Sequence, residues 1–270
     1  MRRIQFLYMP WKSFEGVVMN TFFYIIIAMI GTIFGSFFTL ATYRIPRKED
    51  ITHSRSYCPN CKHRLEFYDL IPILSYIFLG AKCRYCKEPI NCRYILLEIL
   101  SGIVFVLLAL SIGLTIYSGI GLIMEYIYLV LIVSVLSIML GIGNKINITV
   151  VLFGFLINAI YLYFFNNNIE LFYSLIYNTF VFEIFALITY LILYIFKNNS
   201  FINNILNNYL SFVIYVALLI FIFNINIVLI LLVITLGIAL ITRLFKIKIN
   251  YVMYISFLSI AWLIINNFIG

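Results

Sequence analysis

Cys58-Pro59-Asn60-Cys61 is followed, after 21 intervening residues, by Cys83-Arg84-Tyr85-Cys86. Each motif places two thiols on one tight turn, and a chain that folds back between the motifs brings all four sulfurs together. Four thiolates in a tetrahedron suit Zn²⁺, and iron accepts the same set. The spacing therefore predicts a metal site, with zinc as the expected metal and iron as the alternative; its ligands are Cys58, Cys61, Cys83 and Cys86.

The rest of the chain is strongly apolar. Of its 270 residues, 64% are hydrophobic and only 10% are charged, which is too apolar for a soluble globule. A helix needs roughly 20 apolar residues to cross the hydrocarbon core. Eight stretches approach that length, at about 20–43, 95–117, 119–141, 147–166, 171–196, 208–223, 224–242 and 250–268. We therefore expect an all-α polytopic membrane protein with about eight transmembrane helices and a zinc-stapled loop between the first two.

Basic residues are concentrated in this loop. Positions 44 to 93 hold ten of the 18 lysines and arginines in the chain. Loops on the cytoplasmic side have the excess of these residues, so we expect the loop to be cytoplasmic and both termini to lie outside. The cytoplasm is reducing, which favours metal-bound thiolates over two disulfides.

Two further features of the loop have simple interpretations. Cys92 stands beside Arg93 at the expected membrane entry; it is either a spare ligand or, as we expect, an ordinary buried thiol. The net charge of +8 is compatible with nucleic-acid binding. Membrane topology and anionic headgroups account for it better, so membrane lipids are expected partners and nucleic acid is not.

Two local patterns suggest packing and membrane contacts. Gly31-Thr32-Ile33-Phe34-Gly35 has the GxxxG spacing that lets a second helix approach closely. Residues 65–79, between the cysteine motifs, are amphipathic and aromatic. We expect them to lie against the membrane surface, with Tyr68 and Tyr76 at headgroup level.

Six short segments around the cysteines have a characteristic order and spacing. They are Gly35-Ser36-Phe37-Phe38, Tyr43-Arg44-Ile45-Pro46, Arg55-Ser56-Tyr57-Cys58-Pro59-Asn60-Cys61, Tyr68-Asp69-Leu70-Ile71-Pro72-Ile73-Leu74-Ser75-Tyr76, Cys83-Arg84-Tyr85-Cys86 and Arg93-Tyr94-Ile95-Leu96-Leu97-Glu98. Together they resemble the N-terminal domain of bacterial type IV prepilin peptidases, which are also N-methyltransferases. The resemblance covers about residues 30–115. It departs at Thr39, where the family commonly has Asn, and at Ile95, where it commonly has Pro.

The resemblance implies a domain organisation and a location. Residues 1–28 would be a tail and the start of helix 1, and residues 29–115 the prepilin peptidase N-terminal-like domain, with helix 1, the loop 44–94 and helix 2. Residues 116–270 would be a degenerate peptidase-like helix bundle. The protein is expected to span the bacterial cytoplasmic membrane several times. Its expected partners are the N-terminal helices of prepilins or pseudopilins from a type IV pilus or protein secretion system.

The family implies two activities. Its members cut the prepilin leader with two aspartates and methylate the new N-terminal residue with S-adenosylmethionine. By resemblance, Asp69, Arg93 and Glu98 are the polar candidates for binding this cofactor or the substrate amine. A structural interpretation competes with this one: Asp69 would cap a turn, and Arg93 and Glu98 would pair loosely at the membrane surface.

The catalytic aspartates of the family have no counterparts here. The chain has only two aspartates, Asp50 and Asp69, and both lie in the loop. Leu140 or Gly141 stands where the first family carboxylate would fall, and residues 197–208 contain no acid in the second region. An asparagine cannot replace an aspartate in this role, because its amide does not titrate. We therefore assign no catalytic residue.

Two glutamates lie within expected spans, and intramembrane acids are functional candidates. For Glu125 and Glu183 we expect hydrogen bonds that pack helices, because neither falls near the cytoplasmic side, where the family places its chemistry.

Three functional hypotheses follow. In the first, the protein is a prepilin N-methyltransferase that has lost peptidase activity and leaves cleavage to a separate, active prepilin peptidase. In the second, it is a pseudoenzyme that binds pilin-like helices or assembly partners. In the third and weakest, a partner subunit completes a peptidase.

Overall fold

The computed structural model describes residues 14–53, 55–142, 147–164, 169–195, 200–244 and 251–269. Most of the predicted N-terminal tail lies outside these ranges, as does the start of the second family region at 197–208. Within them the chain is helical and forms no strand apart from two isolated β-bridges in the loop. The all-α expectation is confirmed.

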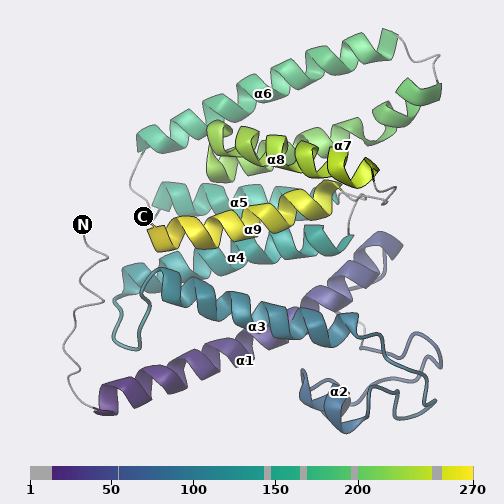
Figure 1. Cartoon of the computed structure of the whole chain (residues 1–270), viewed down its shortest axis with the longest axis vertical. Helices are drawn as coiled ribbons and strands as arrows, with labels where there is room; N and C mark the ends of the chain where they lie inside the picture. The colour runs from purple at the N-terminus through teal and green to yellow at the C-terminus, as the bar shows by residue number, and fades with distance from the viewer. Residues whose placement is uncertain are drawn as a thin grey trace. The chain divides into compact units, whose positions relative to one another are not determined.

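Eight long helices account for most of the described residues (Figure 1). They are α1 (Phe14–Arg44), α3 (Arg93–Ser111), α4 (Ile120–Ile142), α5 (Ile148–Phe164), α6 (Ile169–Ile195), α7 (Ser200–Phe223), α8 (Ile225–Leu244) and α9 (Tyr251–Ile269). Each corresponds to one of the predicted apolar stretches. Among the described residues, α1, α3, α4 and α6 are long and apolar enough to cross a membrane, and the apolar parts of the other four are shorter, at 10–17 residues.

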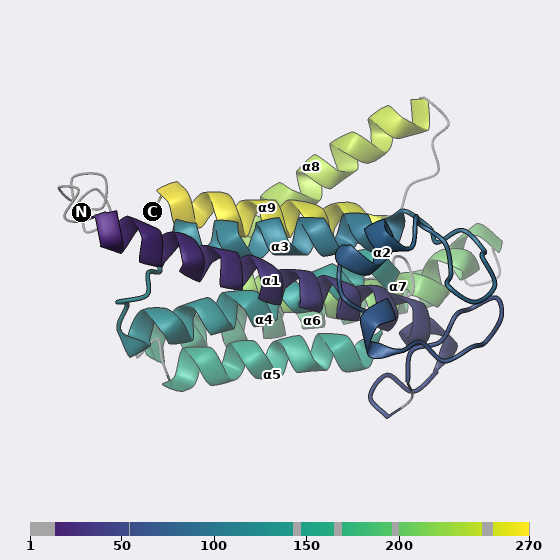
Figure 2. The same cartoon turned by 90° about the horizontal axis from the view of Figure 1, so that it is seen from below.

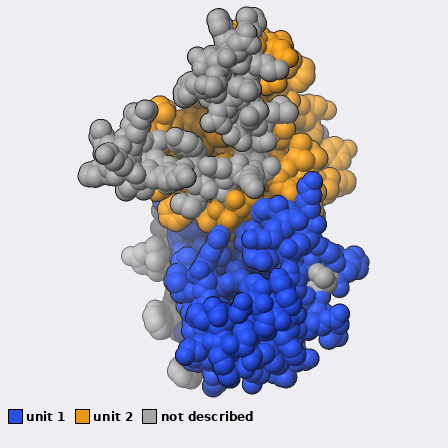
Figure 3. Space-filling model, turned by 90° about the vertical axis from the view of Figure 1, so that its right-hand side faces the viewer, with its two compact units in different colours: residues 1–130, 263–270 blue, residues 131–262 orange. Residues whose placement is uncertain are grey.

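The chain divides into two compact units (Figure 3). Unit 1 comprises residues 1–130 and 263–270, and unit 2 comprises residues 131–262. Unit 1 thus contains α1, the cysteine loop and α3. The domain boundary predicted near residue 116 stays a prediction.

In unit 1, α1 and α3 lie side by side (Figures 1 and 2). Their backbones touch at three glycines. A Cβ added to Gly35 would lie 2.7 Å from Glu98 Cα, and one added to Gly31 would lie 2.9 Å from Gly102 Cα. Real side chains do not approach so closely, so the predicted GxxxG packing is confirmed.

An apolar core supports this helix pair. The α3 side chains of Phe105, Leu108 and Ala109 are fully buried, and the Phe34 ring on α1 lies 5.3 Å from the Phe105 ring. The Tyr126 hydroxyl on α4 donates a hydrogen bond to the Phe105 carbonyl at 3.3 Å. These contacts join α1, α3 and the first part of α4 within unit 1.

In unit 2, the second half of α7 is the central element. Its residues from Tyr215 to Phe221 are buried on all sides. Asn158 on α5 is also buried, and its amide donates to the Phe221 carbonyl at 2.7 Å. The hydroxyl groups of Tyr215 and Ser256 share a hydrogen bond. Polar side chains inside an apolar bundle are thus satisfied by specific partners.

The loop between α1 and α3 contains only short elements. A 3₁₀ turn, η2 (Ile45–Arg47), follows α1, and the 65–79 segment folds as a second 3₁₀ turn, η3 (Phe67–Asp69), and a short helix, α2 (Leu74–Phe78). Both Phe67 and Phe78 are 83% exposed. This exposed apolar surface fits the expected contact with the membrane surface, which stays a prediction.

The close approach of α1 and α3 predicts that Gly35→Ala destabilises the protein. The new methyl group must push away the α3 backbone, which we expect to cost about 1–3 kcal/mol in the free energy of unfolding, more than the gain of about 1 kcal/mol in helix propensity. The free energy of unfolding, measured in mixed micelles for the wild-type protein and the variant, tests this expectation. Gly121→Ala on α4 is the matched control, because no described atom lies within 4 Å of its added Cβ. Equal stability of the two variants would contradict the proposed close contact.

Candidate functional site

The four motif cysteines lie together in the structure. Their sulfur atoms are all within 4.8 Å of one another, and Cys58 Sγ is 3.9 Å from Cys86 Sγ. A tetrahedral metal with bonds of about 2.3 Å to sulfur separates its ligands by about 3.8 Å. The donor atoms and their spacing therefore fit a four-thiolate metal ion.

The first motif forms a tight, hydrogen-bonded turn. The Cys58 N–H donates to the His63 carbonyl at 2.9 Å, and the Lys62 N–H donates to the Cys58 carbonyl at 2.9 Å. Lys62 has a φ of 58°, the left-handed conformation that lets the chain turn back after Cys61. A β-bridge between Tyr57 and Arg64 closes the turn.

The second motif repeats the same geometry. The Cys83 N–H donates to the Glu88 carbonyl at 2.8 Å, and the Lys87 N–H donates to the Cys83 carbonyl at 3.0 Å. Lys87 has a φ of 62°, and a β-bridge joins Lys82 to Pro89. The two turns are thus the same structural unit used twice, as expected for paired metal knuckles. The sequence pattern did not indicate that a lysine follows each motif in the left-handed conformation.

The thiols influence one another electrostatically. The Glu88 N–H lowers the pKa of the Cys86 thiol to about 7, with help from the neighbouring cysteine side chains. The His63 N–H likewise lowers the pKa of the Cys61 thiol. Burial and the sulfurs of Cys86 and Cys58 outweigh this effect and raise the pKa of Cys61 to about 11. The raised pKa favours the protonated thiol of Cys61 at neutral pH, and a bound cation would stabilise its thiolate.

Asp69 connects the intervening segment to the second motif. Its Oδ1 accepts a 2.7 Å hydrogen bond from Arg84 Nε, and its Oδ2 accepts bonds from the Tyr85 hydroxyl at 3.1 Å and the Glu66 N–H at 3.3 Å. Burial by itself raises the pKa of this carboxyl, but these bonds outweigh it and hold the pKa below its usual value. Asp69 also completes a capping box with Glu66 at η3, so it does cap a turn.

Glu98 ties the loop to α3 at a strained turn. Ile73 has φ 63° and ψ −52°, an unusual conformation for a β-branched residue, and the Leu74 N–H closes a γ-turn onto the Pro72 carbonyl at 2.6 Å. The Ile73 N–H donates to Glu98 Oε2 at 2.8 Å. Because Glu98 is only 8% exposed, this bond fixes the loop against the membrane helix.

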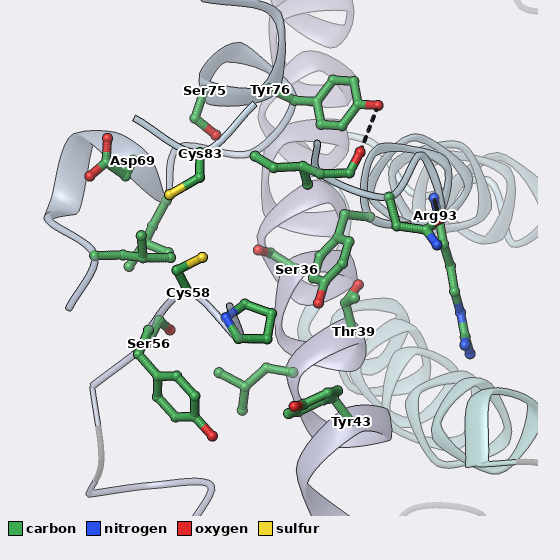
Figure 4. A pocket seen from close by; sticks show the side chains of 18 of the residues that line it. Ser36, Thr39, Tyr43, Ser56, Cys58, Asp69, Ser75, Tyr76, Cys83 and Arg93 are labelled. Atoms are coloured by element: carbon green, nitrogen blue, oxygen red, sulfur yellow. Dashed lines mark hydrogen bonds between the residues drawn. The ribbon is translucent and has the colours of Figure 1, made fainter. Parts of the chain in front are cut away.

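A pocket of about 570 Å³ lies between the metal motifs, the end of α1 and the start of α3 (Figure 4). Most of its lining residues have polar side chains, and we call it the polar pocket. Ser36, Thr39 and Tyr43 line it from α1, and Cys58 and Cys83 line it from the two motifs (Figure 4). Small-molecule sites usually have about 300–1,000 Å³. The pocket is thus large enough for a cofactor or the end of a peptide.

All three polar candidates from the sequence line this pocket, namely Asp69, Arg93 and Glu98. Arg93 is exposed at the first residue of α3, whereas Asp69 and Glu98 are buried. Arg44 also lines the pocket but was not singled out in the sequence. It is only 3% exposed and donates to the carbonyls of Asp50 at 2.7 Å and Arg55 at 3.0 Å. A lone arginine after a long apolar run gives no signal for such a role.

The interpretation of Cys92 as an ordinary buried thiol is wrong. Its side chain is exposed at the N-cap position of α3, where the loop ends. Among the described residues, the cluster that could hold a metal contains the four motif cysteines and not Cys92.

The other acidic residues considered in the sequence lie in three separate segments, namely the loop, α4 and α6. Asp50 caps a turn, since its oxygens accept hydrogen bonds from the N–H groups of Thr52 at 3.0 Å and His53 at 2.9 Å. In the membrane helices, Glu125 is half-buried on α4 and Glu183 is exposed on α6. The helix-packing hydrogen bonds expected for these two glutamates stay a prediction.

Sequence comparisons agree with the geometry of this site. Residues 29–112 match the model of the bacterial peptidase A24 N-terminal domain. The prepilin leader peptidase/N-methyltransferase of Myxococcus xanthus (strain DK1622) is 41% identical over 83 residues, which cover 31% of this chain and 25% of that protein. The one from Vibrio cholerae serotype O1 is 37% identical over 89 residues, covering 30% and 35%, and the one from Bacillus subtilis (strain 168) is 36% identical over 90 residues, covering 33% and 36%. No solved structure matches this chain.

The described structure is thus all-α, with helices of the membrane type and a loop that brings four cysteines together. Over its N-terminal region, the resemblance to prepilin leader peptidase/N-methyltransferases is confirmed. The chain spans about a quarter to a third of the length of the first two of these relatives.

The cysteine cluster predicts that the purified protein binds one metal ion through four thiolates. Substitution with Co²⁺ should give the intense absorption of tetrahedral cobalt thiolate, and metal analysis should distinguish zinc from iron. Cys58→Ser/Cys61→Ser should lose the ion, because two ligands cannot close the site. Cys92→Ser is the matched control and should keep it. Unchanged metal content in the double variant would show that the ligand assignment is wrong.

Proposed function

We propose that this protein is a prepilin N-methyltransferase of the bacterial inner membrane that lacks aspartyl peptidase activity. The observation that carries the proposal is the polar pocket, because it lies within the region that resembles prepilin leader peptidase/N-methyltransferases and is built from that region's own residues. The substrate would be the N-terminal amine of a leader-free pilin or pseudopilin.

The charges around the pocket suit this reaction. S-adenosylmethionine would supply a methyl group bound to a positively charged sulfur. As the unprotonated amine forms the new C–N bond, the methyl C–S bond breaks, neutral S-adenosylhomocysteine leaves, and the methylated amine releases a proton to solvent. Both oxygens of Asp69 are engaged by Arg84, Tyr85 and Glu66. Glu98, whose Oε2 accepts the Ile73 N–H, is another carboxylate that lines the pocket and would balance the charge of a bound cation. Arg93, exposed at the rim, would bind the carboxylate of the cofactor.

The metal would have a structural role. A site closed by four thiolates offers no open position for a substrate, unlike a catalytic zinc site. The ion would hold Cys58 and Cys83 in the wall of the pocket. It would thereby join the two ends of the loop that approach α1 and α3.

The expected loss of peptidase activity rests on the sequence of the membrane helices. An aspartyl peptidase needs two carboxylates that share a proton. Asp50 and Asp69, the aspartates of the chain, are in the loop, and both accept hydrogen bonds from backbone N–H groups. In the first family region, Leu140 and Gly141 stand in the last turn of α4.

The proposed orientation places the loop in the cytoplasm. The basic residues between Arg44 and Arg93 support it through the positive-inside rule. In this orientation the pocket has access to cytoplasmic S-adenosylmethionine. The pilin helix would reach the pocket along the membrane face of α1 or α3.

Co-expression with a cognate prepilin tests the peptidase part. We expect intact leader peptide in mass spectra when this protein is the only candidate peptidase present, because the acid–base pair is missing. A known active prepilin peptidase expressed in the same way is the positive control. A correctly trimmed leader would contradict the proposal and favour a peptidase completed by a partner subunit.

Methyl transfer can be tested with labelled S-adenosylmethionine and a leader-free pilin peptide. The protein should bind the cofactor and label the peptide. Glu98→Gln should lower the rate at least tenfold, since a tenfold loss corresponds to only about 1.4 kcal/mol and a buried charge contributes more than that. Its side-chain carbonyl can still accept the Ile73 N–H, so the turn should be kept.

Glu183→Gln on the exposed face of α6 is the matched control for this charge removal and should leave the rate unchanged. Absence of specific cofactor binding to the wild-type protein would contradict the methyltransferase and favour the second candidate, a pseudoenzyme that binds pilin-like helices. The exposed apolar faces of α1 and α6 favour that alternative, because they offer contact surfaces for other membrane helices.

A further inference from the structure

A second hollow lies beside the first cysteine motif, with a volume of about 560 Å³. It shares only Tyr57 with the polar pocket and is otherwise lined by basic side chains. We call it the basic hollow; its lining residues are His53, Arg55, Tyr57, Lys62 and Arg64. The proposed methyl transfer does not involve these four basic side chains.

Hydrogen bonds hold the residues around the basic hollow in place. Arg44, at the end of α1, donates hydrogen bonds to the carbonyls of Asp50 and Arg55. It thereby ties these two loop residues to the helix. On the other side, the β-bridge between Tyr57 and Arg64 is extended by a hydrogen bond from the Leu65 N–H to the Ser56 carbonyl at 2.9 Å. The backbone at Arg55, Tyr57 and Arg64 is therefore held by hydrogen bonds.

Tyr57 forms the aromatic part of the hollow. The Lys62 ammonium nitrogen lies 5.2 Å from the centre of its ring, and the Arg44 guanidinium carbon lies 5.3 Å from it. Both are within the range of cation–π attraction. The Tyr57 hydroxyl donates to Glu49 at 2.8 Å, which fixes the ring. The position of Lys62 is thus set by the ring rather than by an acidic partner.

Glu49 and Asp50 contact two lining residues of the hollow, Tyr57 and His53, but the other three basic side chains have no acidic ion-pair partner in the described part of the chain. Among the described residues, no carboxylate lies within 4 Å of the charged groups of Arg55, Lys62 or Arg64. The nearest acid in an ion pair is Asp50, which is 3.6 Å from His53 at the edge. Like charges around one hollow repel each other, so an anion bound between them would be favoured.

The position of the hollow favours a lipid phosphate as the anion. It follows directly after the long apolar span that ends at Arg47. The same loop exposes apolar side chains that would sit in the membrane interface, above all Phe67, Phe78 and Ile77. We propose that the basic hollow binds the phosphate of an anionic phospholipid, here tested with phosphatidylglycerol. Phospholipid phosphates lie at this depth at high local concentration, and basic pockets next to membrane helices bind such headgroups.

Native mass spectrometry of the full-length, detergent-solubilised protein tests this site. The protein should bind phosphatidylglycerol in preference to phosphatidylcholine. The variant Arg55→Gln/Lys62→Gln/Arg64→Gln should bind phosphatidylglycerol on the order of a hundredfold more weakly, since each charge-assisted contact with the bound phosphate contributes several-fold to the affinity. Both proteins must contain the same amount of metal, which shows that the loop is folded.

The matched control is Lys48→Gln/Lys82→Gln/Lys87→Gln. It removes the same charge from exposed positions of the same loop, and Lys48 and Lys87 are left-handed like Lys62. It should bind phosphatidylglycerol like the wild-type protein. Equal losses in the two triple variants would overturn the site in favour of general electrostatic attraction.

Two further outcomes would also overturn the proposal. The first is equal binding of phosphatidylglycerol and phosphatidylcholine by the wild-type protein. The second is displacement of the lipid by inorganic phosphate at equal concentration, which would indicate a free anion as the ligand. Failure of the methyl-transfer assay has no bearing on these results.

Discussion

The direct contact between the backbones of α1 and α3 is the constraint on which the N-terminal unit depends. Gly35 brings α1 against Glu98 Cα, so the end of one helix and the start of the other are held at a fixed separation. The cysteine loop leaves from the first and returns to the second. Because both of its ends are fixed, the loop has only a limited set of closed conformations, and the two cysteine motifs can meet within one of them.

Charged side chains then fasten the loop to this helix pair. Arg44 binds the carbonyls of Asp50 and Arg55, and Glu98 binds the N–H of Ile73. Asp69 joins the intervening segment to the second motif through Arg84 and Tyr85. Buried charges of this kind are costly unless they are hydrogen-bonded, and here each has specific partners. The polar pocket is the space enclosed by these contacts, so its shape depends on the same residues that fold the loop.

The division of the chain into two units explains how methyl transfer could be kept without proteolysis. The pocket and its supporting contacts lie within unit 1, whereas the regions in which the family places its aspartates lie in unit 2. Unit 2 has its own core around the second half of α7, with Asn158 and Tyr215 satisfied inside it. Loss of carboxylates from one unit therefore does not require any change in the contacts of the other, which is the physical basis for proposing methyl transfer without proteolysis.

The sequence by itself determined the helices, the glycine contact and the four cysteines, because apolar length, GxxxG spacing and paired CxxC motifs are local patterns. It also determined the absence of aspartates from the membrane helices, which is a matter of composition. Only the tertiary structure decided the roles of Arg44 and Glu98, since their partners are backbone groups that have no sequence signature. The exposure of Cys92 and the joining of Asp69 to Arg84 were also decided there. These depend on how a loop folds back over a helix pair, and long-range contacts of that kind are set by three-dimensional packing rather than by neighbouring residues.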